Sequence, residues 1–194
     1  MFALALAAVL AQAPTAAPLP PSKKAAYMAD KRDAKTSTPA RRGQRADRPI
    51  WAHNLRTHEI RALTGPAGIA AGPAGQADRS AFFRCWFTHG HGPIPAELVA
   101  KIVESAEHFK VREVRIISGF RHPKYNLQLR KKGHEVAASS HHTDANAIDY
   151  FFPEVETRPL YDWLLANHPG GVGFYPVSEF VHIDTGRKRT WKGV

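Results

Sequence analysis

The chain has 194 residues, a hydrophobic fraction of 43% and a formal net charge of +10 at pH 7. This length and composition suffice for one folded domain with a real core. The single cysteine, Cys85, excludes an internal disulfide and a thiolate zinc site, and its aromatic neighbours are typical of a buried thiol. The positive charge favours a polyanionic partner such as nucleic acid, an acidic cell wall or a membrane surface.

The first 13 residues resemble an export signal. An apolar run from Phe2 to Leu10 precedes the small residues AQA at 11–13, although no Lys or Arg precedes the run. The run is too short to span a bilayer, and we expect no transmembrane segment elsewhere. These features favour export to the periplasm or the cell envelope. The alternative is a disordered Ala-rich leader or a misplaced start.

Residues 14–48 predict a disordered basic linker, because they contain almost no large apolar side chains. Nine Lys and Arg residues against three Asp residues in this segment account for six of the ten net positive charges. The charge therefore belongs mainly to the linker, which argues against nucleic-acid binding by the folded domain. We expect the linker to contact anionic polymers of the envelope.

Residues 49–194 are expected to form the folded domain. Residues 50–63 predict a pair of strands around a polar turn, and the Gly-, Ala- and Pro-rich residues 64–80 predict a loop. Apolar side chains recur at helical spacing through residues 95–109, after a proline near the start, and predict an amphipathic helix.

The next part of the chain continues to mix the two element types. Residues 111–118 predict a strand because they are rich in β-branched side chains. Residues 124–133 predict a short basic helix that ends at Gly133. Residues 146–152 predict a further strand, which Pro153 ends.

The C-terminal part predicts an amphipathic helix at 158–168, stopped by the sequence PGG, and then the last two strands at 171–176 and 180–186. The elements show no regular alternation of strand and helix. We therefore predict an α+β fold, with a small, mainly antiparallel sheet and flanking helices.

Strand periodicity predicts where two polar side chains point. In 146–152, Asp149 lies on the face opposite Ile148 and Tyr150, and in 180–186, His182 lies opposite Val181 and Ile183. If the apolar faces point into the core, Asp149 and His182 project to the same open side.

The polar loop SSHHT at 139–143 adds a histidine to these two side chains. Two imidazoles and one carboxylate form a ligand set typical of a catalytic zinc site, with His142 as the loop ligand. His141 is a competing ligand, and eleven histidines in the chain give many chance pairs.

Arg121 lies in the sequence SGFR, just after the strand predicted at 111–118, where loops commonly carry functional residues. A guanidinium there could hold a carboxylate or a developing oxyanion. A solvated surface arginine is the alternative.

Four ordered blocks within residues 117–191 resemble a known family. They are SGFRHPKYN, SSHHTDANAID, GGVGFYP and FVHIDTGRKRTW. This set is similar to the murein endopeptidase K-like zinc peptidases of the D-Ala-D-Ala metallopeptidase and hedgehog fold class. The resemblance implies a hedgehog/DD-peptidase-like fold, a Zn²⁺ cofactor and hydrolysis of peptide stems or crosslinks of peptidoglycan.

The resemblance also implies roles for individual residues. The implied zinc ligands are His142, Asp149 and His182. Ser140 falls on the family's substrate-contacting serine, and Arg121 on the arginine that steadies the reacting carbonyl. Ala145 departs from the pattern, because a family glycine stands at this position; if that glycine needs a positive φ, the turn is strained here.

The general base has two candidates. Asp184 belongs to the block FVHID and shares a strand face with His182, so strand parity favours it, but it could instead orient a ligand. Glu179 lies three residues before His182, a spacing that resembles the base-and-ligand pair of D-Ala-D-Ala dipeptidases. An alternative for the whole domain is a non-catalytic zinc-binding domain of the same fold.

Overall fold

A computed structural model of the chain describes residues 48–69, 75–133, 137 and 139–193. The expected leader, residues 1–13, lies outside these ranges, as does the expected linker, 14–48, apart from Arg48. Within the described ranges, no helix combines the length and the apolar character that a membrane crossing needs.

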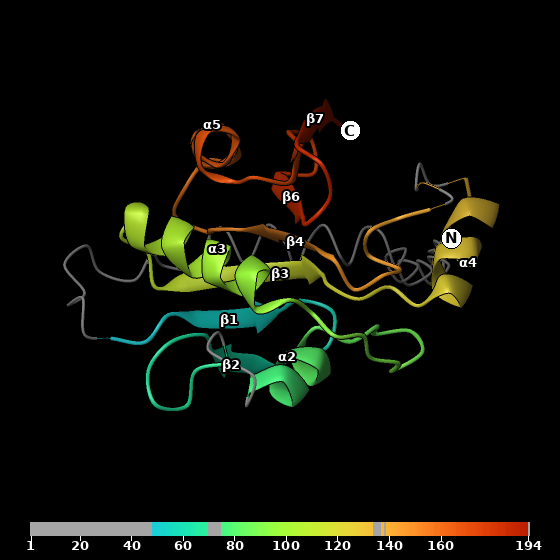
Figure 1. Ribbon diagram of the computed structural model, residues 1–194, viewed down its shortest axis with the longest axis horizontal. Helices are drawn as coiled ribbons and strands as arrows, with labels where there is room; N and C mark the ends of the chain where they lie inside the picture. Colours follow the sequence, from blue (N-terminus) through green and yellow to red (C-terminus); the bar gives the residue numbers. More distant parts are fainter. Residues whose placement is uncertain (1–47, 70–74, 134–136, 138, 194) are drawn as a thin grey trace, which may run out of the picture.

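Seven strands form one mixed sheet, in the order β2-β1-β3-β4-β6-β5-β7 (Figure 1). The strands are β1 (Trp51–Asn54), β2 (Ile60–Ala62), β3 (Glu113–Ser118), β4 (Ala147–Phe151), β5 (Gly171–Tyr175), β6 (Phe180–Asp184) and β7 (Arg189–Lys192). Four neighbouring pairs are antiparallel, whereas β1–β3 and β5–β7 are parallel. The α+β class is confirmed, but the sheet is larger and more mixed than the sequence predicted.

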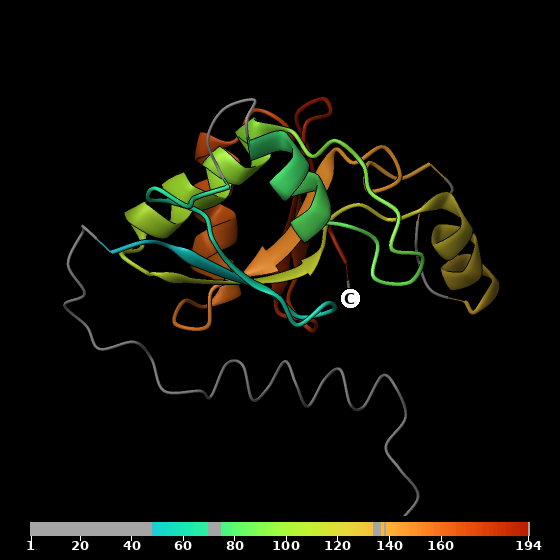
Figure 2. The same cartoon turned by 90° about the horizontal axis from the view of Figure 1, so that it is seen from below.

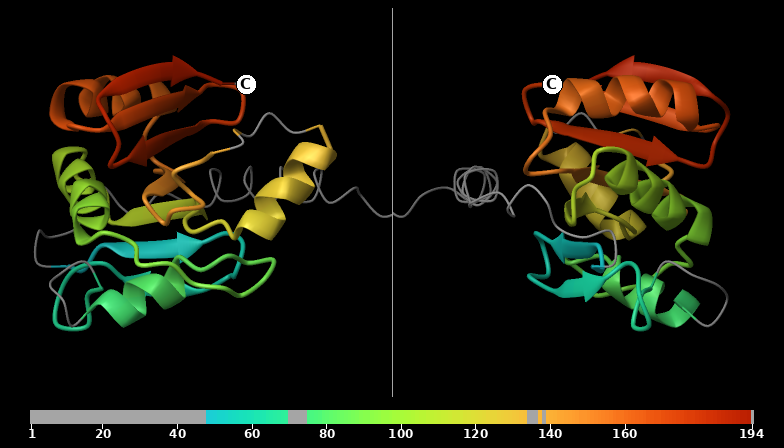
Figure 3. Two further views of the ribbon diagram at one scale, coloured as in Figure 1. Left: turned by 45° about the vertical axis from the view of Figure 1, so that its right-hand side comes forward. Right: turned by 90° about the vertical axis from the view of Figure 1, so that its left-hand side faces the viewer.

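The helices are α2 (Gln76–Phe82), α3 (Ala96–His108), α4 (Pro123–Lys131) and α5 (Thr157–Asn167). Figure 2 shows α2, α3 and α5 on one side of the sheet, and α5 packs on β5 and β6 and also contacts α3. The short helix α4 projects from one end of the sheet (Figure 3). The helix begins at Pro123, and the His122 side chain caps this end by accepting a hydrogen bond from the Lys124 amide. Gly133, at φ +77°, follows the other end of the helix.

Two elements correct the sequence prediction. Helix α2 occupies part of the segment expected to be a loop, 64–80, and the buried Arg79 ties it to the carbonyls of Ile69 and Ile94 at 3.3 and 3.4 Å. Strand β7 follows the two strands expected to be the last, and it is held by parallel pairing with β5 rather than by apolar alternation of its own. Both elements depend on partners distant in the sequence.

The apolar core lies between the sheet and the helices α3 and α5. Ile148 and Tyr150 of β4 and Val181 and Ile183 of β6 are all 0% exposed and belong to it. The Tyr150 hydroxyl lies 3.0 Å from Ser105 Oγ of α3, so the polar end of this buried ring has a partner. The strand faces opposite the core are therefore free to carry polar side chains.

Candidate metal centre

Strands β4 and β6 place a carboxylate and an imidazole side by side. They pair antiparallel with Asp149 directly opposite His182, so both side chains leave the sheet on the face away from the core. This confirms the strand parity read from the sequence. Each residue is only 6% exposed.

His142 reaches the same place from the loop that precedes β4. Thr143 closes a turn by donating its amide and its hydroxyl to the Ser140 carbonyl, at 2.7 and 2.6 Å. Ala145 adopts φ +59°. This is the left-handed conformation that the family's glycine at this position suggested, and it strains an alanine. The turn therefore uses the backbone conformation that glycine favours, with an alanine in place.

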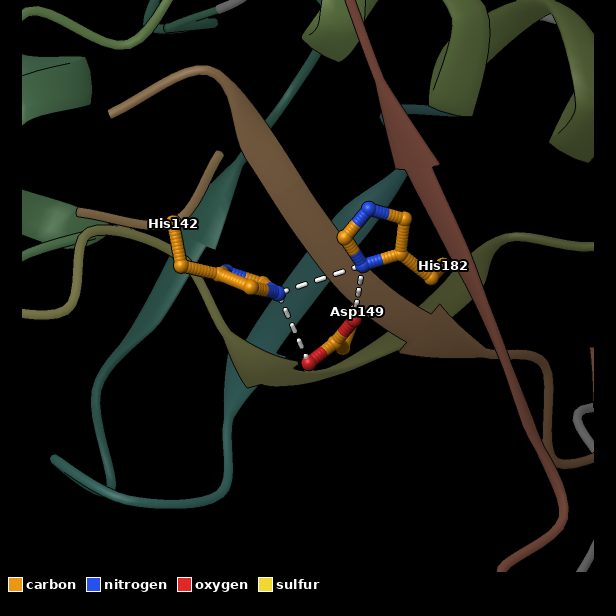
Figure 4. Close-up of side chains that lie close together, drawn as sticks. All are labelled: His142, Asp149 and His182. Carbon is orange, nitrogen blue, oxygen red and sulfur yellow. Dashed lines mark hydrogen bonds and ion pairs between the residues drawn. The ribbon is translucent and has the colours of Figure 1, made fainter. Parts of the chain in front are cut away.

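The three side chains converge on one point (Figure 4). His142 Nε2 lies 3.2 Å from His182 Nδ1 and 3.1 Å from Asp149 Oδ2. The remaining pair, His182 Nδ1 and Asp149 Oδ1, is separated by 2.8 Å. One ligand atom from each residue thus lies within 4.8 Å of the other two.

The outer nitrogen of each imidazole has its own acceptor. His142 Nδ1 donates to the Gly119 carbonyl at 2.8 Å, and His182 Nε2 donates to Asp184 Oδ2 at 3.0 Å. In a neutral ring with that tautomer, the inner nitrogen carries a lone pair. The lone pairs of His142 Nε2 and His182 Nδ1 and the Asp149 carboxylate then converge in the protein interior. This set of donor atoms fits a metal cation.

The electrostatics of the cluster also favour a cation. Burial would raise the pKa of Asp149, but the charges and hydrogen bonds of His142 and His182 outweigh burial and hold that pKa well below its usual range. Burial would lower the pKa of His182, yet hydrogen bonds to Asp149 and Asp184 raise it. The two carboxylates that attract a proton to this ring would equally attract a metal ion.

The pKa of His142 moves the other way. Burial lowers it, the positive charges of Arg121 and His182 lower it further, and Asp149 offsets only part of the shift. This shift favours the neutral His142 ring, which is the form that can donate its lone pair to a metal.

Arg121 lies beside the cluster. Its Nη2 is 3.8 Å from Asp149 Oδ2 and 3.5 Å from Ser118 Oγ, and its backbone amide donates to the His142 carbonyl at 2.9 Å. An irregularity in β3 after Ile116 precedes this segment. Gly119 is required here, because a Cβ would lie 2.7 Å from the Phe83 carbonyl oxygen.

Asp184 lies on the far side of the His182 ring from Asp149. It is 0% exposed, and both its oxygens bond Arg189, at 3.0 and 2.7 Å. The hydrogen bonds from His182 and Arg189 hold its pKa low, against the effect of burial. The competing histidine, His141, approaches Asp184 at 3.9 Å and is not in the three-residue cluster.

The other two residues singled out in the sequence do not belong to the three-residue cluster. Ser140 Oγ accepts a hydrogen bond from the His142 amide at 3.3 Å, so it supports the ligand loop. Glu179 is exposed, has φ +55° and immediately precedes β6. Strand parity therefore does not govern the direction of the Glu179 side chain.

Three residues around His182 received no role from the sequence. Trp191 packs against the His182 ring with centroids 5.0 Å apart, and Arg189 holds Asp184. Both stand in the block FVHIDTGRKRTW, which was the available signal. His168 Nε2 donates to the Asp184 carbonyl at 2.8 Å, and nothing in its local sequence marks it.

The α+β fold, the buried His, Asp and His cluster and the neighbouring arginine define a metallopeptidase type of protein. The family model described as peptidoglycan L,D-endopeptidase MepK matches residues 69–191, and the chain belongs to this family. The matched residues include the whole cluster.

Two curated relatives share about two fifths of their aligned residues with the chain. The probable peptidoglycan L,D-endopeptidase MepK of Haemophilus influenzae is 39% identical over 82 residues, which cover 42% of this chain and 44% of the relative. The peptidoglycan L,D-endopeptidase MepK of Escherichia coli K12 is 40% identical over 80 residues, covering 41% and 44%. The matches thus span less than half of each relative, and no solved structure matches the chain.

Proposed function

We propose that this protein is a zinc-dependent peptidase that hydrolyses peptide bonds of bacterial peptidoglycan, with the L,D-endopeptidase action named for its relatives. Family membership supports the reaction class. The observation that carries the proposal is the convergence of two imidazole nitrogens and one carboxylate, with both outer nitrogens already bonded.

The donor set suits zinc, with His142, Asp149 and His182 as its ligands. Histidine nitrogen and aspartate oxygen are common zinc ligands, and catalytic sites typically use three protein ligands. Bound zinc supplies a Lewis acid for the scissile carbonyl and makes a coordinated water more acidic. The protein fixes both ring orientations through Gly119 and Asp184.

Arg121 is proposed to bind the carbonyl oxygen of the scissile peptide. Its guanidinium is charged, mostly buried and 3.8 Å from Asp149, so it presents hydrogen-bond donors at the edge of the cluster. Donors held in this way stabilise negative charge as it develops on the substrate. Ser140 is proposed to donate its hydroxyl proton to substrate, because its oxygen accepts from the His142 amide and its proton has no acceptor among the described residues.

We assign Asp184 to orientation and Glu179 to proton transfer. Asp184 is fully buried, bonds the outer nitrogen of His182 and has both oxygens bonded to Arg189. It therefore cannot exchange protons with a substrate on the open side of the cluster. Its hydrogen bond to the ring is the carboxylate–histidine contact that fixes metal ligands. Glu179 is exposed and lies just before the strand that carries His182, where a carboxylate can exchange protons with water.

Peptidoglycan as substrate requires that the protein act outside the cytoplasm. The apolar run and the AQA sequence within residues 1–13 support export to the periplasm or cell envelope. The basic residues of 14–48 are proposed to contact anionic envelope polymers, which would keep the domain near its substrate.

Digestion of purified peptidoglycan by the full-length protein tests this proposal. Zinc-loaded protein is expected to release fragments whose masses identify an L,D bond as the one cut, and a chelator should abolish the release. Protein that binds zinc tightly but releases no fragment from any peptidoglycan would instead be a non-catalytic zinc-binding domain. Cleavage that persists after complete zinc removal would contradict the proposed role of the cluster.

A further inference from the structure

Tyr175, the last residue of β5, lies on the sheet face that carries the metal cluster, and strands β4 and β6 separate β5 from β3, which Arg121 follows. The neighbouring strands β3, β4, β6 and β5 contribute residues in that spatial order. The residues are Arg121 just after β3, Asp149 on β4, His182 on β6 and Tyr175 on β5. Gly173 pairs with His182, and Tyr175 lies two residues further along the same strand, so Tyr175 leaves the sheet on the face that carries the cluster.

The position of the Tyr175 ring is fixed by aromatic neighbours. It stacks on Phe180 with centroids 4.3 Å apart and an interplanar angle of 12°. Trp191 Nε1 donates to the Tyr175 hydroxyl oxygen at 3.0 Å, and the same indole packs against His182. The phenol is therefore held by the residue that also supports a ligand.

The Tyr175 hydroxyl retains a proton that it can donate. An indole nitrogen is a donor only, so Trp191 uses the hydroxyl oxygen as acceptor. Among the described residues, the hydroxyl has no hydrogen-bond acceptor of its own. An oriented donor without an acceptor, on the wall of a proposed active site, calls for a substrate atom as its partner.

The surroundings of the phenol favour its protonated form. Burial raises the pKa of Tyr175 above its ordinary value, the hydrogen bond from Trp191 opposes this, and Asp149 and Arg121 act in opposite directions. The hydroxyl therefore remains protonated at neutral pH, as a hydrogen-bond donor must be.

We propose that the Tyr175 hydroxyl is a catalytic hydrogen-bond donor to the carbonyl oxygen of the scissile peptide, acting across the cluster from Arg121. This inference rests on the proposed peptidase function. The carbonyl oxygen gains negative charge as its carbon is attacked, so a fixed donor binds it more strongly then than in the ground state. The phenol keeps its proton throughout, and the two donors hold the oxygen from opposite sides.

Tyr175→Phe in the full-length, zinc-loaded protein is the direct test. The substitution keeps the ring and its stacking on Phe180 but removes the hydroxyl. We expect kcat to fall about a hundredfold, with KM and zinc content unchanged. Tyr161→Phe is the matched control, because Tyr161 stacks on Phe174, whose neighbours on β6 belong to the core face of the sheet. This control should retain the wild-type kcat.

Binding of a phosphinate peptide, a tetrahedral analogue with anionic oxygens, provides a measurement independent of turnover. Its affinity should fall in Tyr175→Phe by a factor similar to the loss in kcat, while the affinity for the cleaved peptide product stays constant. A kcat within about twofold of wild type, or a rise in KM alone, would overturn the role of Tyr175. Wild-type protein that cuts no peptidoglycan would instead overturn the proposed function itself.

Discussion

At the scale of single residues, the tasks proposed for Asp184 and Glu179 can be tested separately. Glu179→Gln should lower kcat about a hundredfold or more while zinc stays bound, because it removes a proton acceptor but no ligand. Asp184→Asn should weaken zinc binding about 10- to 100-fold, because it removes the charge that orients the His182 ring. Turnover and zinc content measured on the same preparations separate the two effects. Full activity in both variants would show that neither acid is needed.

We expect His168 to make the free energy of unfolding depend on pH, and this dependence can be measured apart from catalysis. Burial lowers its pKa from 6.5, and its Nδ1 has no hydrogen-bond partner among the described residues. Below about pH 6.5 the unfolded chain therefore binds a proton at His168 that the folded protein does not, so the free energy of unfolding falls as pH decreases.

His168→Gln tests this dependence, because glutamine can still donate an amide hydrogen toward the Asp184 carbonyl but does not titrate. Between about pH 7.5 and about pH 5.5, wild-type protein should lose more unfolding free energy than the variant. Denaturant unfolding at both pH values measures the difference. Identical losses in the two proteins would mean that His168 titrates normally in the folded state.

At the scale of elements, the loop that carries His142 depends on a close contact between two small residues, Gly92 and Ala145. A Cβ added to Gly92 would lie 2.5 Å from the Ala145 Cβ and 2.8 Å from the Phe120 ring. Gly92→Ala should therefore reduce the free energy of unfolding by about 1 to 3 kcal/mol and weaken zinc binding, because Ala145 belongs to the loop that carries His142.

Ala145→Gly should change stability little, because relief of the left-handed φ, about 1 kcal/mol, is offset by loss of a buried methyl, about 0.8 kcal/mol. Combined with Gly92→Ala, it should restore part of the lost stability. Thermal or denaturant unfolding of the two single variants and the double variant measures the coupling. Strictly additive changes would contradict a direct contact.

Local sequence patterns predicted those parts of the site that depend on strand periodicity. The alternation around Asp149 and His182 predicted their common face, because each strand carries apolar partners on the opposite side. Strand parity does not specify which edge of an imidazole a neighbour meets, so the position of Asp184 behind His182 was not predictable. The edge strand β7 was missed because its pairing with β5 is a tertiary contact.

At the scale of the whole molecule, the fold should be independent of the chain before the sheet. A variant lacking residues 1–47 retains Ile50, which is fully buried, and every strand and cluster residue. It should fold and bind one zinc as the full-length protein does. Circular dichroism and metal analysis of the shortened protein measure both properties.

Removing residues 1–55 should have the opposite result. This deletion eliminates β1, which pairs with both β2 and β3, and exposes the core surface that Ile50 and Ala52 cover. We expect a protein that does not fold cooperatively. Cooperative unfolding with zinc bound after this larger deletion would show that the β1–β2 part of the sheet is dispensable.

The most direct test of the metal centre uses the two adjacent histidines as a matched pair. Zinc content and peptidoglycan cleavage should be measured together on His142→Ala and His141→Ala of the full-length protein. His142 contributes Nε2 to the cluster. His141 is not part of the cluster, and its Nε2 lies 3.9 Å from Asp184 Oδ1. The expected result is loss of zinc and cleavage in His142→Ala, with one zinc per chain and cleavage retained in His141→Ala. Full zinc occupancy in His142→Ala, together with its loss in His141→Ala, would contradict the proposed ligand set.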